Sequence, residues 1–224
     1  MSKVLSFVKL DFVTIKPYMT LKNLILFIAV AVIMTISSDM SASGIGVLMI
    51  FAGLYVTYPF AIGEKTDIDA LYITLSIKRS TVVLGRYLFA FVVDVSSGLL
   101  AYFFTFVIFT GLKKGFNAIE SLIIVVVVFF IYSIIQAIQL PIFFKLGYTK
   151  AKFLGYIPFM GIPLVVVLFG NFFKNMVLTE QITNFLNWFE TNPIAAVLLG
   201  VAFWLMIMAV SYQVSFAYYN KRDF

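Results

Sequence analysis

The sequence predicts an all-α integral membrane protein with six transmembrane helices, which form one domain over residues 1–224. Of the chain, 62% is hydrophobic and only 12% is charged, against about 25% charged residues in a typical soluble domain. Its apolar residues gather in six segments, at 24–37, 44–62, 82–110, 122–144, 153–173 and 195–218. About 20 apolar residues cross a hydrocarbon core ~30 Å thick, and five segments reach this length unaided. The first reaches it only with residues 21–24 included.

Residues 1–17 predict an amphipathic helix that lies in the inner membrane interface before the first span. The apolar residues at helical spacing are Leu5, Val8, Phe12 and Ile15. Lys9 and Lys16 fall on another face, and Pro17 turns the chain toward the first span. A polar extension of the first span is the alternative. The interruptions by Lys3, Lys9 and Asp11 leave no apolar core for a signal peptide.

The connection between the second and third spans, residues 63–81, predicts a short amphipathic helix over 66–75. Its apolar residues at i, i+3, i+4 and i+7 are Ile68, Leu71, Tyr72 and Leu75. Thr66 is the expected N-cap, Asp67 and Asp69 suit the positive end of the helix, and Lys78 and Arg79 follow its C-terminus. Such a helix buries its apolar stripe on lipid or in a groove of a partner protein. An ordinary solvated loop is the plainer alternative.

Asp94 is the one carboxylate well inside a predicted span, about 12 Å deeper than Arg86 at 1.5 Å per helical residue. An intramembrane carboxylate is costly and points to a position inside the protein. One face of the third span carries small and polar residues, which are Ala90, Asp94, Ser97, Gly98, Ala101 and Thr105. The fourth span carries a second polar stripe, which consists of Tyr132, Gln136 and Gln139. Both stripes fit either a translocation path or close helix packing.

Residues 174–192 form the longest outer connection. Apolar residues near helical spacing, together with Trp188, predict a helix on the outer membrane interface. This segment is either a structural cap or a gate.

The distribution of basic residues predicts the orientation of the chain. Of 16 Lys and Arg residues, only Lys113, Lys114 and Lys174 fall in outer loops when the N-terminus is placed in the cytoplasm. This asymmetry follows the positive-inside rule and places both termini inside. The net charge of +6 therefore reflects topology and contact with anionic membrane lipid, with no nucleic-acid partner expected.

The sequence contains neither cysteine nor histidine. It therefore lacks the usual zinc ligands and any thiol or histidine-based catalytic group. It also has no GxxxxGK[ST] phosphate-binding loop. We expect no enzyme activity, no metal and no cofactor bound by this chain, and a function in passage, binding or scaffolding.

Residues 75–87, with the sequence Leu-Ser-Ile-Lys-Arg-Ser-Thr-Val-Val-Leu-Gly-Arg-Tyr, resemble a pattern in permease subunits of bacterial ABC type-2 exporters. That pattern is Leu-Pro-(Val/Ile)-Ser-Arg-x-x-(Ile/Val)-Val-x-Gly-Lys-Tyr, and it follows a short acidic segment, as Glu64, Asp67 and Asp69 do here. The basic ending at 219–224 is also similar. The chain departs from the pattern at Ser76, where the family usually has proline.

The resemblance implies a multi-pass permease in a bacterial cell membrane, paired with a second permease copy, identical or related, and with cytoplasmic ATPase subunits that bind ATP and Mg. Residues 66–75 would be the coupling helix in the ATPase groove. Ile68, Leu71, Tyr72 and Leu75 would be its buried anchors. Its charged rim would consist of Glu64, Asp67, Asp69, Lys78 and Arg79. Small permeases of this kind resemble those that export amphipathic peptides, such as phenol-soluble modulins, or confer immunity to peptide antibiotics. An amphipathic peptide or lipid-like substrate is therefore expected.

Two other functional classes remain open at this stage. A membrane adaptor or sensor subunit would present the same helix at 66–75 to a soluble partner. A secondary transporter would use Asp94 for coupling, although such proteins usually carry more ionisable groups at mid-membrane and internal repeats.

Overall fold

The computed structural model describes residues 2–222 except 39–40, 67, 114 and 155–190, and within these residues every regular element is a helix. The elements are α1 (Ser2–Ile15), a 3₁₀ turn (Lys16–Tyr18), α2 (Leu21–Ser38), α3 (Ser41–Thr66), α4 (Ile68–Thr74), α5 (Arg79–Gly111), α6 (Ala118–Leu146) and α9 (Pro193–Asn220). A further helical stretch covers 148–154. The all-α prediction is therefore confirmed.

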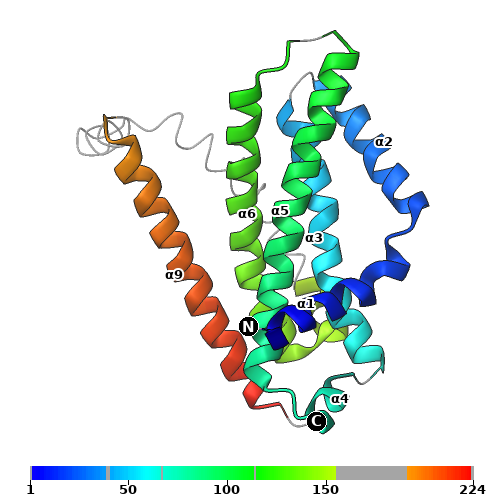
Figure 1. Ribbon diagram of the computed structural model, residues 1–224, viewed down its shortest axis with the longest axis vertical. Helices are drawn as coiled ribbons and strands as arrows, with labels where there is room; N and C mark the ends of the chain where they lie inside the picture. Colours follow the sequence, from blue (N-terminus) through cyan, green and yellow to red (C-terminus); the bar gives the residue numbers. More distant parts are fainter. Residues whose placement is uncertain (1, 39–40, 67, 114, 155–190, 223–224) are drawn as a thin grey trace.

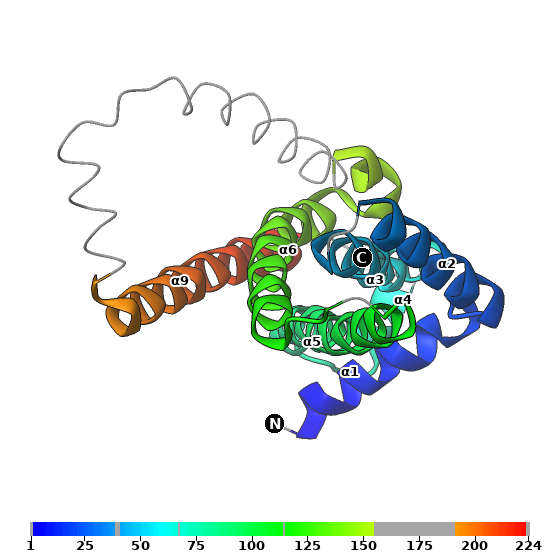
Figure 2. The ribbon, with the colours of Figure 1, turned by 90° about the horizontal axis from the view of Figure 1, so that it is seen from above.

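The helices α3, α5 and α6 stand side by side as a bundle, with α2 against α3 and α9 against α6 and α5 (Figures 1 and 2). α1 lies across the lower part of the bundle in Figure 1, and α4 lies below it. α9 contacts the bundle near its own C-terminus and leans away from α6 toward the other end. We call the end with α1, α4 and the C-terminus of α9 the basic end. The lysines and arginines predicted to be cytoplasmic lie on α1 or in and beside the loops and helix termini of this end, except Arg86, which is two turns inside α5.

Four helices are long and apolar enough to cross a membrane by themselves, namely α3, α5, α6 and α9. α2 passes the same test only together with α1, from which it is bent by 84°. The predicted first span is thus the short one, as its sequence indicates. The predicted fifth span lies almost wholly outside the described residues, and so does the outer segment 174–192 apart from its last two residues.

α1 is a separate helix that turns sharply into α2, as the sequence predicts. Phe7, Val8, Asp11 and Ile15 are buried, and α1 contacts α3 and α5. Leu5 is exposed, and the contact of α1 with the membrane interface stays a prediction.

The connection between α3 and α4 also differs from the prediction. α3 continues to Thr66, and the Thr66 hydroxyl donates a hydrogen bond back to the carbonyl of Ile62 (2.8 Å). Thr66 is therefore the last residue of α3 and not the N-cap of the next helix. α4 begins at Ile68 and has only seven residues.

Two clusters of buried side chains hold the described part of the chain together. The larger one joins α1, α3, α4, α5, α6 and α9 at the basic end, and includes Phe7, Tyr72, Val83, Phe89, Phe144 and Tyr219. The smaller one joins α3, α5 and α6 farther along the bundle, around Ile45, Met49 and Ala101. The basic end is thus the most extensively interlocked part of the structure.

Candidate functional site

The apolar stripe of α4 is divided between the interior and the surface. Tyr72 is 3% exposed and contacts the ring of Phe7 edge-on, with ring centroids 5.1 Å apart. Ile68 is half-buried beside the same cluster. Leu71 and Leu75 are 51% and 62% exposed. One pair therefore anchors α4 to its own bundle, and the other pair remains on the surface.

The turn at the C-terminus of α4 contains a residue in the left-handed conformation, Ser76. Ser76 has φ of 52°, and the amide of Ile77 donates to the carbonyl of Tyr72 (2.9 Å), the six-to-one hydrogen bond of a Schellman motif. Proline cannot adopt this conformation, since its ring fixes φ near −65°. Ser76 therefore has a structural consequence. The chain leaves α4 by a turn that a proline at this position would prevent.

Gly85 and Arg86 lock α1 to α5. A side chain at Gly85 would collide with the ring of Phe7, so glycine permits α1 to cross closely. The Arg86 guanidinium forms a salt bridge with Asp11 (Nη1 to Oδ1, 2.8 Å) and donates from Nη2 to the carbonyl of Pro59 in α3 (3.3 Å). Arg86 and Asp11 are 4% and 1% exposed. The guanidinium carbon also lies 4.9 Å from the ring centroid of Phe60, a favourable cation–π position.

Tyr87, the next residue, fastens α5 to α9. Its hydroxyl is 2.6 Å from the hydroxyl of Ser211 and 2.8 Å from that of Ser215. Ser211 in turn donates to the carbonyl of Ala137 in α6. The three consecutive residues Gly85, Arg86 and Tyr87 thus join α5 to α1, α3 and α9, and through Ser211 to α6. We call them the junction.

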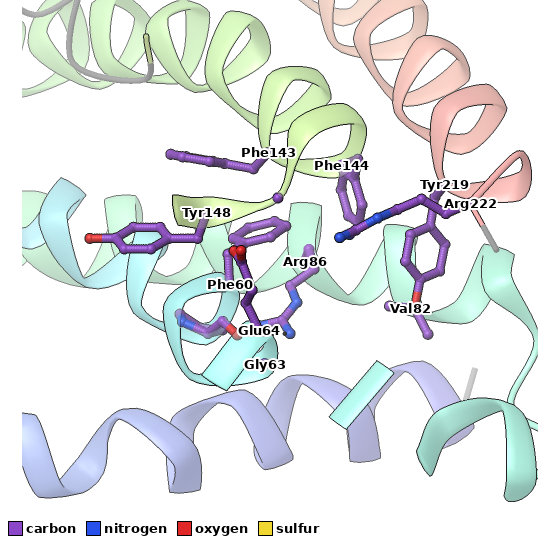
Figure 3. A pocket seen from close by; sticks show the side chains of 12 residues that line it. Phe60, Gly63, Glu64, Val82, Arg86, Phe143, Phe144, Tyr148, Tyr219 and Arg222 are labelled. Atoms are coloured by element: carbon purple, nitrogen blue, oxygen red, sulfur yellow. Dashed lines mark hydrogen bonds between the residues drawn. The ribbon is translucent and has the colours of Figure 1, made fainter. Parts of the chain in front are cut away.

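A small enclosed cavity lies beside the junction, where α3, α5, α6, the 148–154 stretch and the end of α9 meet (Figure 3). Its volume is about 20 Å³, enough for one water molecule. Glu64 accepts a hydrogen bond from the amide of Thr149 (2.8 Å) and lies near the positive charge of Arg222. The rings of Phe60, Phe144 and Tyr219 close the space. Glu64 thereby ties α3 to the helical stretch that follows α6.

The residues of the predicted charged rim around α4 differ in their surroundings: some contact other parts of the chain and others are exposed. Arg79 donates from Nη1 to the carbonyls of Tyr219 and Asn220 at the C-terminus of α9, the negative end of that helix. Glu64 points to Thr149, as above. Lys78 is exposed at the start of α5. Asp67 and the side chain of Asp69 lie outside the described residues. Glu64 and Arg79 therefore make contacts within the chain, and their predicted role toward a partner stays a prediction.

Asp94 is buried in the middle of the bundle and meets the polar stripe of α6. Its Oδ1 accepts a hydrogen bond from Nε2 of Gln136 (2.8 Å), and Asp94 is 2% exposed. Ser97 donates to the backbone carbonyl of Asp94, and Tyr132 lies within electrostatic reach of the carboxylate. The structure thus brings together Asp94, Ser97, Gln136 and Tyr132, as the sequence suggested. Gln139 is also buried, one turn closer to the basic end.

The small and polar stripe of α5 is buried throughout, as predicted for a face directed into the protein. At its far end the Thr105 hydroxyl is buried with no hydrogen-bond partner among the described residues. Packing is close at Gly98, where an added side chain would touch Val125 and Met49. This position therefore permits close helix contact. A role of Asp94 in translocation remains a prediction.

An apolar pocket of about 130 Å³ lies in the elbow between α1 and α2. Aromatic rings dominate its wall, among them Phe12, Phe27, Tyr55 and Phe104, while Ser96 and Ser97 supply its only hydroxyls besides that of Tyr55. The volume is close to that of an apolar cavity of about 150 Å³ that admits benzene. This pocket therefore has room for one apolar side chain or a short length of acyl chain.

Among the described residues, no three acidic, histidine or cysteine side chains lie close enough together to hold a metal ion.

Sequence reasoning missed Asp11, Ser211 and Ser215. Asp11 carried a usable signal, because it stands midway between Phe7 and Ile15 at i−4 and i+4 on an otherwise apolar helix face. The two serines of α9 lie four residues apart on one helix face. No local pattern identifies their partner Tyr87, which is more than 120 residues away.

The chain was compared with known families, curated proteins and solved structures. The family described as ABC-2 family transporter protein matches residues 6–220. No curated protein and no solved structure matches. The family match includes the junction, α4 and the Asp94–Gln136 pair. The chain therefore belongs to the ABC-2 transporter family and is a transmembrane subunit of an ABC transporter.

Proposed function

We infer that this chain is the permease subunit of an ATP-driven exporter of amphipathic or hydrophobic substrates, with an amphipathic peptide as the first candidate. Two permease copies, identical or related, would work with separate ATPase subunits that bind ATP and Mg. The family implies a partner ATPase and a membrane setting. The identity of the substrate and of both partners is our proposal.

The observation that carries the proposal is the divided face of α4. An isolated helix of seven residues is too short to be stable in water, so α4 is held in place by Tyr72 and Ile68. Leu71 and Leu75 then stand on the surface at the basic end, where no contact within the described chain covers them. Exposed leucines on a short, firmly attached helix are suited to fill a groove of a partner protein.

Movement of α4 has a structural route into the bundle. Tyr72 contacts Phe7 of α1, and the Schellman turn connects α4 to the start of α5 within a few residues. Two turns further, the junction links α5 to α1, α3, α6 and α9. A push on α4 by an ATPase would therefore displace several helices together and favour rocking between inward-facing and outward-facing states.

The substrate class is supported by the elbow pocket and by the buried polar pair beside it. The pocket accepts apolar groups, and Ser97 belongs both to its wall and to the surroundings of Asp94. A site with an apolar wall and a nearby carboxylate suits a substrate that is apolar on one side and polar or cationic on the other.

The test is co-purification of the ATPase encoded beside this gene, with the wild-type chain and with Leu71→Asp and Leu75→Asp. A buried charge at either leucine should abolish capture, because it would remain unpaired in the groove. Leu146→Asp is the matched control, since Leu146 is also an exposed leucine at the basic end, located on α6.

Capture by the wild type and by Leu146→Asp, together with loss in both α4 variants, is the expected result. Equal capture by all four proteins would refute the assignment of α4. Failure of the wild type to capture any ATPase, with the protein folded and inserted, would refute the proposed function as a whole.

A further inference from the structure

We propose that the groove between α1 and the segment joining α4 to α5 binds the headgroup of an anionic phospholipid. The groove has a volume of about 890 Å³, within the range of about 300–1,000 Å³ of ordinary ligand sites. It is much larger than the cavity beside the junction and shares no lining residue with it. This proposal goes beyond the transport function, and it shares one residue with it, since Leu75 of the proposed ATPase contact also lines the groove.

The walls of the groove combine positive charge with apolar surface. Lys3 on α1 and Lys78 at the start of α5 stand on opposite walls, and both are exposed. Val4, Phe7 and Leu10 form an apolar floor along α1. Among the described residues that line the groove, none is acidic. An anion between the two lysines would therefore meet no opposing carboxylate from this lining.

The position of the groove matches the height of lipid phosphates. α1 lies across the basic end of the bundle and is bent by 84° from α2, which enters the membrane (Figure 1). A helix in this orientation lies in the interface between headgroups and acyl chains. Leu10 is exposed at the groove, so an acyl chain can continue from the headgroup along the apolar surface of α1.

Charge complementarity selects an anionic lipid as the occupant. Basic pockets at the cytoplasmic side of membrane proteins bind anionic headgroups, and each lysine near an anionic surface contributes roughly fivefold in affinity. Two groove lysines near one phosphate therefore predict a preference of roughly twenty- to thirtyfold over a zwitterionic lipid with the same acyl chains.

The test is native mass spectrometry of the purified, delipidated full chain in detergent, titrated with phosphatidylglycerol or with phosphatidylcholine of identical acyl chains. The double variant Lys3→Gln/Lys78→Gln should lose roughly twenty- to thirtyfold in affinity for phosphatidylglycerol. Val4→Trp should also lose binding, because it fills the floor of the groove while both lysines remain. Lys9→Gln/Lys22→Gln is the matched control, since it removes the same charge from exposed lysines outside the groove.

The proposal is supported if the wild type and the control bind phosphatidylglycerol and both groove variants lose it. All four proteins should also elute as single species and unfold at similar temperatures. Equal loss in the control variant would show attraction by net charge alone and overturn it. Equal binding of phosphatidylcholine, displacement by inorganic phosphate, or displacement by the partner ATPase would each assign the groove to something other than an anionic lipid.

Discussion

At the scale of single residues, the buried ion pair of Asp11 and Arg86 is the most consequential feature of the basic end. A buried pair contributes little beyond what an apolar pair of the same size would contribute, but removing one partner leaves a charge without compensation. Arg86 has additional partners in the Pro59 carbonyl and the Phe60 ring. These contacts favour a single orientation of α1 on the bundle.

Asp11→Ala should therefore destabilise the protein by about 3–5 kcal/mol, because it leaves the Arg86 guanidinium buried and unpaired. The double variant Asp11→Leu/Arg86→Met should recover most of this loss, since neither charge remains. The free energy of unfolding in detergent, measured by denaturant titration, checks both. An Asp11→Ala variant as stable as the wild type would show that the ion pair does not hold α1.

Asp94 gives the second residue-scale prediction. Asp94→Asn keeps the size of the side chain and a hydrogen bond to Gln136, so the unfolding temperature should change little. Export in a cell-based or vesicle assay should fall clearly if the carboxylate contacts the substrate. Ser121→Ala, which removes a buried hydroxyl of α6 outside the pocket wall, is the control expected to export normally. If Asp94→Asn exports as well as the wild type, the carboxylate is not needed for export, and Asp94 serves helix packing.

At the scale of elements, α4 shows which structural features the sequence can and cannot specify. Its apolar stripe at 68–75 predicts a helix at nearly the right place because helical periodicity is local. The division of the stripe into Tyr72 inside and Leu71 outside depends on where α1 lies, and no local pattern contains this information. The same limit applies to α1, where the spacing of the apolar residues does not reveal that Asp11 is buried against Arg86.

The turn after α4 leads to an element-scale prediction. Ser76→Gly should stabilise the turn by up to about 1–2 kcal/mol, because glycine adopts positive φ without steric cost. Ser76→Pro should disrupt it, since proline is excluded from φ of 52°. Hydrogen exchange of the Ile77 amide, which donates to Tyr72, reports the turn directly.

Slower exchange in Ser76→Gly and much faster exchange in Ser76→Pro are the expected pair of results. Thr74→Gly, two residues earlier within α4, is the control and should exchange faster than the wild type, because glycine weakens a helix interior. Unchanged exchange in Ser76→Pro would mean that the turn is formed differently in the membrane.

At the scale of the whole molecule, the basic end gathers the interactions between distant segments, while the opposite end is held by fewer contacts. α9 shows this most clearly, since Tyr87 fastens it near its C-terminus, Trp204 still donates a hydrogen bond to Ser133 of α6, and its N-terminal part leans away from α6 (Figure 1). The long apolar helices α3, α5, α6 and α9 were predictable because each is a continuous apolar run in the sequence. The junction was not, because Asp11, Arg86 and Ser211 come from three separate parts of the sequence.

The orientation of the whole chain gives the last prediction. The sequence contains no cysteine, so single cysteines can be introduced without a background of native thiols. A membrane-impermeant maleimide should label Lys113→Cys, in the short connection between α5 and α6, on intact cells. Lys150→Cys and Lys221→Cys, both exposed at the basic end, should be labelled only after the cells are permeabilised. The reason is the concentration of lysine and arginine at that end, which retains it in the cytoplasm during insertion. Labelling of Lys150→Cys on intact cells would show that the topology is the opposite of the predicted one. α4 would then lie on the side of the membrane away from any cytoplasmic ATPase.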